Sequence, residues 1–475
     1  MPVLIYKFNL NMFQELRSTV YSELIEQNAD VISCFSPNGM NFAYVLQCQL
    51  IILDVESQKT VQKFICDYTI DCLSWSPDSE LVYCCSKKQG SIQIWNLTNP
   101  VWRCKIMENP LAVAEVHWAP DSRHLLVISE FHLKMTVWSL VSTTIAVIEN
   151  PKPVKNCLSF SSCERYLTVA ERRKCEDFIS IYTCYTWEIL KFFSVETKDL
   201  SGIYFSPSDL VIGVLEAYIE EPKVVFYSID GRILGKYIRS SMFGFTSFSW
   251  NSNGKMISLG DYSGVVTILD GSKYVEIISY HETDSIDCEK TTVYKVSPKS
   301  VESGASGNVS SSLELFEVLK GEPFVLASLA THSEKSKSKH AKYGIRTLRF
   351  SHCGNYLLSL NGSFPNMLFV FNLSTFMLSS VVLHHHKIKA DVSWHPTKSL
   401  LAFCCGSQNV YLWTPTCCIS LWSPFRGECP SHSVQWCSRR NCLLLNGKNH
   451  SALLYLPDVD PHPSGVSQDV LSAAT

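Results

Sequence analysis

The stretch Ser74-Trp75-Ser76-Pro77-Asp78-Ser79 joins two hydrophobic runs and has the composition of a tight turn. Before it, Cys72-Leu73-Ser74-Trp75 alternates with the period of two that is typical of a half-buried strand. In the turn, proline fixes φ, and the aspartate and serine side chains can bond the nearby backbone. Leu81-Val82-Tyr83-Cys84-Cys85 then forms a second apolar run. The stretch predicts two strands joined by a turn, with Trp75 as a core anchor.

The same pattern recurs along the chain at nearly constant intervals. A second clear copy is His117-Trp118-Ala119-Pro120-Asp121-Ser122. The anchors of the copies are Phe35, Trp75, Trp118, Phe160, Phe205, Trp250, Phe350, Trp394 and Trp436, with intervals of 40, 43, 42, 45, 45, 100, 44 and 42 residues. A period of roughly 40–45 residues built from short strands is typical of WD-type propeller blades of four strands each. The sequence therefore predicts an all-β WD-repeat β-propeller.

The repeat count favours one large ring of eight or nine blades, with a seven-bladed ring plus flanking β-structure as the alternative. The blades are degenerate, because third strands that should end in Trp-Asp end in Trp95-Asn96, Trp138-Ser139 and Trp413-Thr414. We place the propeller at residues 31–456. The preceding segment, 1–30, is either a closing strand or a short helix, and residues 457–475 are expected to be a disordered tail because they are rich in Pro, Asp and Ser.

The interval of 100 residues indicates an irregular insertion at about 281–343. It is either a long inserted loop or a blade without a recognisable anchor. Within it, the Ser- and Gly-rich stretch 297–312 is expected to be a mobile loop. The lysines between 335 and 342 are expected to form a flexible basic linker.

Composition and motifs exclude several functional classes. The net charge of −3 provides no global field for nucleic acid or an anionic membrane, and no run approaches the length of a membrane span. Neither a phosphate-binding glycine loop nor a nucleophile elbow is present, so we expect no enzyme activity and no cofactor. The 20 cysteines contain no C-x-x-C pair. We therefore expect no metal site, either at His384-His385-His386 or among Cys429, Cys437, Cys442 and His450.

The loops between the second and third strands of successive blades should emerge on one face, where a partner could bind. These loops contribute Lys87 and Lys88; Glu130, Phe131 and His132; Glu171, Arg172, Arg173 and Lys174; and Glu216, Glu220 and Glu221. One sector is thus predicted to be basic and the next acidic, an arrangement that could orient a charged helical partner.

Several strings are more specific than a generic WD pattern. SEFHLKMTVWSL (129–140), AERRKCEDFISIY (170–182), KQGSIQIWNLTNPVWRCKI (88–106) and YSIDGRILGKY (227–237) resemble the WD-repeat family of centrosomes, centriolar satellites and spindle poles. The resemblance runs from about Ser33 to about Leu456. It implies a non-enzymatic scaffold of the cytoplasm and cytoskeleton that supports microtubule anchoring, spindle assembly and ciliogenesis.

The same resemblance implies a partner. This is a coiled-coil microtubule minus-end anchoring protein of the synovial-sarcoma-X-interacting (Msd) type, joined in fungi by a minus-end-directed kinesin. Two functions from other classes compete with this one. The first is a substrate receptor of a ubiquitin ligase, a common use of WD propellers, and the second is a cryptic hydrolase or metal enzyme.

Overall fold

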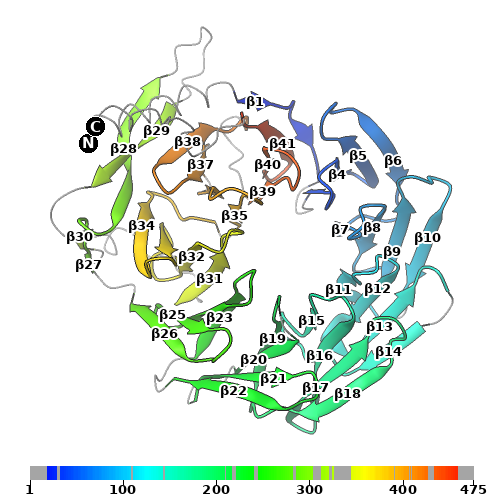
Figure 1. Ribbon diagram of the computed structural model, residues 1–475. Coiled ribbons are helices and arrows are strands. Elements are labelled where there is room, and N and C mark those ends of the chain that lie inside the picture. The colour runs from blue at the N-terminus through cyan, green and yellow to red at the C-terminus, as the bar shows by residue number, and fades with distance from the viewer. Residues whose placement is uncertain are drawn as a thin grey trace, which may run out of the picture.

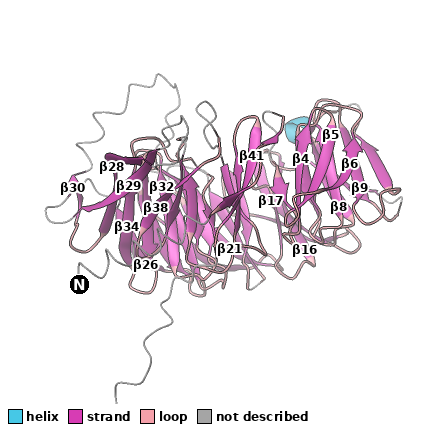
Figure 2. Cartoon of the chain, turned by 90° about the horizontal axis from the view of Figure 1, so that it is seen from above, coloured by secondary structure: helices cyan, strands magenta, loops and turns pink. Residues whose placement is uncertain are grey.

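The computed structural model describes residues 19–457 except 29–32, 109–110, 143–144, 209, 217–220, 240–243, 282–284, 303–311, 320–323, 326–343, 390, 406, 408 and 426–432. Its described residues form nine blades around a central axis (Figure 1). Viewed edge-on, the ring is a flat disc with the strands crossing its thickness (Figure 2). The prediction of an all-β propeller is confirmed with nine blades, and the seven-bladed alternative is wrong.

Blade two shows how the quoted stretch folds. It contains β7 (Cys72–Trp75), β8 (Leu81–Ser86), β9 (Ser91–Asn96) and β10 (Arg103–Met107), paired antiparallel in that order. The turn after β7 closes with a hydrogen bond from the Ser79 N–H to the Ser76 carbonyl, and Ser79 has a φ of 66°. β7 lies near the axis and β10 at the rim (Figure 1).

Six further blades have the same antiparallel order. Blade one has β3 (Cys34–Phe35), β4 (Asn41–Leu46), β5 (Gln49–Asp54) and β6 (Thr60–Ile65); blade three has β11 (Val113–Trp118), β12 (His124–Ser129), β13 (Lys134–Ser139) and β14 (Ile145–Glu149); blade four has β15 (Leu158–Phe160), β16 (Tyr166–Arg173), β17 (Glu176–Thr183) and β18 (Ile189–Ser194). Blade five has β19 (Leu200–Phe205), β20 (Val211–Glu216), β21 (Lys223–Ser228) and β22 (Ile233–Ile238); blade six has β23 (Phe245–Trp250), β24 (Met256–Asp261), β25 (Val265–Asp270) and β26 (Glu276–His281); blade eight has β35 (Ser393–Trp394), β36 (Leu401–Cys404), β37 (Asn409–Trp413) and β38 (Cys418–Trp422).

Blade seven carries the insertion. Its core is β31 (Ile345–Phe350), β32 (Tyr356–Asn361), β33 (Met367–Asn372) and β34 (Met377–Leu383), and β28 (Thr292–Glu302) pairs parallel with β34. β29 (Ser312–Leu319) then pairs with β28, while β27 (Ser285–Ile286) and β30 (Phe324–Val325) form a separate ladder. The insertion thus extends one blade to six strands and is not a blade of its own.

The predicted loop at 297–312 is therefore only partly correct. Residues 297–302 continue β28 and Ser312 begins β29, because the two segments pair with each other as a hairpin. Residues 303–311 lie outside the described residues, as do the basic linker at 335–342 and the predicted tail from residue 458 onward.

Both ends of the chain meet in blade nine. It consists of β39 (Ser433–Trp436), β40 (Cys442–Asn446) and β41 (His450–Tyr455), and the N-terminal strands β1 (Val20–Tyr21) and β2 (Ile25–Glu26) both pair with β41. The Tyr21 ring also contacts the Trp422 ring of blade eight, 5.7 Å away. The N-terminal segment therefore supplies the outer strand of the last blade and holds the ring closed.

The tryptophan anchors also join neighbouring blades. The indole N–H of Trp118, Trp250, Trp394 and Trp436 donates to the carbonyl just before the preceding anchor, at Ser74, Tyr204, Arg349 and Ser393, over 3.4, 3.4, 3.2 and 3.0 Å. The turns connect as well, because the Asp78 N–H donates to the Ser122 hydroxyl of the next blade. Each repeat is thus packed and hydrogen-bonded to the repeat before it, as a blade that cannot bury its own faces requires.

Candidate interaction surface

The turns between the second and third strands of the blades lie on one side of the ring, which we call the hairpin face. The 3-10 turn η1 (Glu130–His132) lies on this side, at the upper edge of the disc in Figure 2. The turns of blades two, three and four are those for which the sequence predicted partner contacts.

The hairpin of blade four is the longest of the three. β16 and β17 have eight residues each, whereas the middle strands of blades two and three have six. The pairs Arg172–Asp177 and Arg173–Glu176 continue the ladder to a two-residue turn, Lys174-Cys175. Both turn residues have positive φ, 49° and 66°, as a tight hairpin with right-handed twist requires. The hairpin of blade four is thus longer by two residues in each strand than those of blades two and three.

Arg172 is part of an ion network beneath this hairpin. Lys152 and Asp177 are buried, and their side chains meet over 2.9 Å. Lys152 also bonds Asp199 over 2.7 Å, and Arg172 binds both Asp177 and Asp199, over 3.2 and 2.9 Å. Two cations and two carboxylates are therefore matched. Arg172 stabilises the fold here and is not free to bind a partner.

Arg173 is also held from within the chain. Its guanidinium binds the buried Glu171 carboxylate over 2.6 Å and lies over the Phe192 ring, 4.9 Å from its centroid. Glu171 accepts a further hydrogen bond from Ser180. Arg173 is still about half exposed, so only one side of its charge faces solvent.

Lys174 is the unpaired cation of the hairpin. It is exposed, and within the part of the chain that the structure describes it makes no hydrogen bond or ion pair. The basic sector expected at 172–174 thus reduces to Lys174 and part of Arg173, because the acids Glu171, Asp177 and Asp199 neutralise the rest.

The turn of blade three presents an apolar side chain. Phe131 has a φ of 61° and is 76% exposed, and Leu133 beside it is 53% exposed. Glu130 is exposed, while His132 is half-buried. The Leu133 carbonyl accepts the Asn150 N–H, and Pro151 next in sequence bridges to Glu171. The backbone after the turn of blade three is thus joined to the base of the blade-four hairpin.

The remaining predicted residues divide between surface and interior. Lys88 is exposed and Lys87 half-buried in the turn of blade two. Glu221 is exposed and Glu220 lies outside the described residues. Glu216, in contrast, is 1% exposed, and its carboxylate accepts the N–H groups of Lys198 and Asp199 over 2.9 and 2.7 Å. The interpretation of Glu216 as a loop residue needs correcting, because it caps backbone donors inside the fold.

Glu216 belongs to a pattern that sequence reasoning missed. The second strand often ends in a buried polar residue that bonds nearby backbone or a cation, as Asp261 does with the Val265 N–H and with Arg239. The members of this set are Ser86, Ser129, Glu216, Asp261, Asn361 and Asn446. In these six blades the sequence carries the signal as one polar residue at the end of the apolar second strand.

Among the described residues, no cluster of three or more His, Cys, Asp or Glu has the arrangement of a metal site. His384 interacts with the Tyr411 hydroxyl over 2.8 Å, and Cys437 and Cys442 are buried between blades nine and one. No helix in the described part of the chain is long and apolar enough to cross a membrane.

Fold and surface together define a WD-repeat propeller, a fold that typically serves as a non-enzymatic scaffold for protein binding. A family model for the WD domain, G-beta repeat, matches residues 58–96. The chain is 33% identical over 434 residues to WD repeat-containing protein WRAP73 of Mus musculus, covering 89% of this chain and 93% of the relative. It therefore belongs to the WD-repeat protein family that includes WRAP73.

Two further matches are more distant. An uncharacterized WD repeat-containing protein of Schizosaccharomyces pombe (strain 972 / ATCC 24843) is 24% identical over 342 residues, 68% of this chain and 65% of that protein. Among solved structures, the C-terminal WD40 domain of Sif2 matches with a TM-score of 0.50 and 11% identity, over 92% of this chain and 99% of that one. The match to the Sif2 domain shows a likeness of fold alone.

Proposed function

We propose that the protein is a scaffold of centrosomes, centriolar satellites and spindle poles. Its hairpin face over blades three and four binds a coiled-coil microtubule minus-end anchoring protein of the synovial-sarcoma-X-interacting (Msd) type. Through this partner it supports microtubule anchoring, spindle assembly and ciliogenesis, and a minus-end-directed kinesin joins the complex.

One observation carries the proposal. The two strings with the most specific family resemblance, 129–140 and 170–182, fold as β12–η1–β13 and as β16–β17, which are neighbouring hairpins on one face. Between them they present the exposed Phe131 and the unpaired Lys174. In these strings Arg172, Glu171 and Asp177 form ion pairs that stabilise the fold. The fold does not in the same way explain Phe131, whose ring is exposed and whose φ is positive.

The chemistry of the face suits a helical partner. Aromatic side chains packed into pockets are enriched among binding hot spots, and charged side chains at the flanking positions of a coiled coil can reach an adjacent cation. Phe131 would supply the apolar anchor and Lys174 a salt bridge to an acidic side chain. Neither contact requires breaking the ion network of blade four.

The test is purification of the tagged full chain from dividing cells, as wild type and as Phe131→Ala and Lys174→Glu variants. Wild type should co-purify the minus-end anchoring protein and localise to pericentriolar material. Phe131→Ala should weaken this association by about tenfold or more, the usual loss for a hot-spot aromatic. The control is Tyr185→Ala, which removes an 81% exposed ring from the opposite side of blade four.

If both variants bind the anchoring protein as well as wild type does, the hairpin face over blades three and four is not its binding site. Diffuse localisation without the anchoring protein would contradict the function as a whole. Capture of a cullin adaptor in its place would favour the ubiquitin-ligase alternative.

A further inference from the structure

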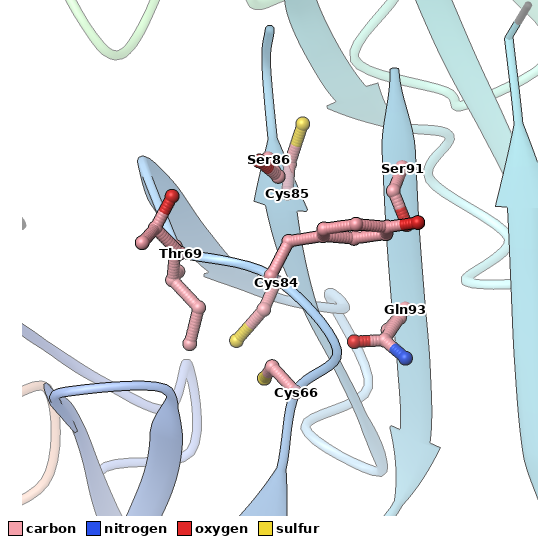
Figure 3. Close-up of a pocket in the computed structure, with 9 residues that line it drawn as sticks. Cys66, Thr69, Cys84, Cys85, Ser86, Ser91 and Gln93 are labelled. Atoms are coloured by element: carbon pink, nitrogen blue, oxygen red, sulfur yellow. The ribbon is translucent and has the colours of Figure 1, made fainter. Parts of the chain in front are cut away.

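Blade two contains two pairs of thiols on opposite faces of β8. Cys84 packs with Cys66 between blades one and two, whereas Cys85 packs with Cys72 between blades two and three. Figure 3 shows the Cys66 and Cys84 sulfur atoms together and the Cys85 sulfur pointing away from them. Neighbouring residues of a strand face opposite ways, so the doublet Cys84-Cys85 supplies one thiol to each pair.

Cys72 and Cys85 have the geometry of a dithiol that can close. They are direct partners in the antiparallel ladder between β7 and β8. The Cα atoms of such partners lie about 4.5–5.5 Å apart, within the range of about 4.4–6.8 Å that a disulfide spans. As ladder partners they face the same side of the sheet, and both pack in the apolar cluster between blades two and three.

The two thiols differ in reactivity in a complementary way. Cys72 is partly exposed, whereas Cys85 is fully buried. The neighbouring Cys85 thiol lowers the pKa of Cys72, burial opposes this, and the Lys87 ammonium lowers the pKa further, whereas the Cys72 sulfur and burial raise the pKa of Cys85. Because the thiolate is the nucleophile, Cys72 is the thiol that an oxidant in solution reaches and attacks first.

The second pair lacks these properties. Cys66 and Cys84 are 5% and 3% exposed, and burial raises the pKa of Cys84 well above its ordinary value. The cavity that they line is about 10 Å³, room for one water molecule. This pair therefore serves as an internal comparison for the first.

We propose that Cys72 and Cys85 are a redox modification site, at which a hydroperoxide oxidises the pair to a cross-strand disulfide and a dithiol reductant restores it. The Cys72 thiolate attacks one peroxide oxygen, so that an S–O bond forms, the O–O bond breaks and hydroxide leaves as water. Cys85 then attacks the Cys72 sulfenic acid, the S–S bond forms and a second water leaves. Two thiols and one hydrogen peroxide thus give one disulfide and two waters.

The disulfide would lie directly below the turn of blade two. Asp71, next to Cys72, accepts the Lys87 N–H over 2.7 Å, and Lys87 follows Cys85 by two residues. The site therefore lies under the same turn that carries Lys87 and Lys88 but does not depend on the function proposed for the hairpin face.

Peptide mapping of the full chain tests this inference. The protein is treated with hydrogen peroxide, free thiols are alkylated, and trypsin releases residues 64–87, which contain all four cysteines. A second cleavage after Glu80 separates Cys66 and Cys72 from Cys84 and Cys85. We expect a loss of two hydrogens, a link between Cys72 and Cys85, and reversal by dithiothreitol.

Two cysteine-to-serine variants, which change the size of the side chain little, test which thiols form the link. Cys85→Ser should lose the link and leave a Cys72 sulfenic acid that dimedone labels, whereas Cys84→Ser should retain the link. Thermal unfolding confirms that the variants fold, and the wild-type map stands without them. A link between Cys66 and Cys84, no link at all, or oxidation of Cys72 no faster than that of the buried Cys157 would overturn the proposal.

Discussion

Single residues decide how each blade joins the next. Four anchor tryptophans use the ring for the core and the indole N–H for the preceding blade, whereas the phenylalanine anchors can supply the ring alone. Trp75 differs, since its buried indole N–H has no hydrogen-bond partner among the described residues. Substituting Trp75 and a hydrogen-bonded anchor tryptophan can therefore measure what the indole hydrogen bond contributes to stability.

Replacing Trp436 by Phe should lower the free energy of unfolding by about 1–2 kcal/mol, because the hydrogen bond to the Ser393 carbonyl is lost. Trp75→Phe is the matched control and should cost less, because it removes a buried donor that has no acceptor. Chemical denaturation of both variants measures the difference. Equal losses would mean that the indole bond contributes nothing.

The ion network of blade four should be sensitive to loss of one member. Lys152→Ala leaves the buried Asp177 carboxylate without its closest cation, and such a deletion costs about 3–5 kcal/mol. Lys155→Ala, at an exposed lysine three residues on, should change stability by less than about 0.5 kcal/mol. Urea unfolding curves compare the two variants. A small effect at Lys152 would show that the network is not a stabilising feature.

Asp199 should make stability depend on pH. Burial acts to raise its pKa, but the hydrogen bond and charge of Lys152 and then of Arg172 outweigh burial and lower it. As pH falls, the unfolded state therefore takes up the proton first. The stabilisation is complete above the unfolded pKa of about 4 and is lost as pH falls through the folded pKa.

Asp199→Asn should accordingly lose less stability than wild type between about pH 5 and pH 2. Asp391→Asn, which removes an exposed carboxylate, is the control and should follow the wild-type curve. Parallel curves for wild type and Asp199→Asn would contradict the assignment.

At the scale of elements, the turn after the first strand repeats from blade to blade, whereas the β16–β17 hairpin departs from the common length. The turn after the first strand has a positive φ at the same place in blade after blade, at Gly39, Ser79, Ser122, Glu164, Gly254 and Gly354. The sequence showed this turn clearly where Pro-Asp-Ser marks it. The long β16–β17 hairpin was less visible, because Glu-Arg-Arg-Lys indicates a charged loop and not a continued strand.

A glycine substitution that relieves backbone strain tests whether the β16–β17 hairpin ends in a tight turn. Cys175 adopts a φ of 66°, which costs a residue with a side chain roughly 1 kcal/mol. Cys175→Gly should therefore raise the melting temperature slightly, or at least not lower it. Cys163→Gly, at an exposed cysteine without positive φ, should lower it, because glycine only adds freedom to the unfolded chain. The opposite order would indicate that Lys174-Cys175 is not a tight turn.

The candidate surface was only partly predictable for a related reason. Spacing put Arg172 and Arg173 near a hairpin turn, where they lie, but it put Glu216 in a loop although Glu216 is buried at the end of β20. Spacing also carries no information on which acid meets which base. The partners Lys152 and Asp199 lie 25 and 22 residues from Asp177 in sequence, and only the closed blades bring them together. The sequence prediction, which counted every charged residue of the loop, therefore overestimated the charge that is available to a partner.

At the scale of the whole molecule, a regular period was enough to predict a ring. The interval of 100 residues could not be resolved from sequence, because β28 and β29 have strand composition but no anchor. β28 is placed by pairing with β34, and β29 by pairing with β28. Closure also depends on distant segments, since β1 and β2 must find β41 more than 400 residues away. No local pattern encodes that contact.

An experimental structure of the full chain, by crystallography or electron cryomicroscopy, tests this ring most directly. We expect nine blades around one axis, with Val20–Tyr21 and Ile25–Glu26 paired to His450–Tyr455 and the insertion added to the outer edge of blade seven. A ring of seven or eight blades, or one in which the N-terminal strands lie elsewhere, would contradict the account.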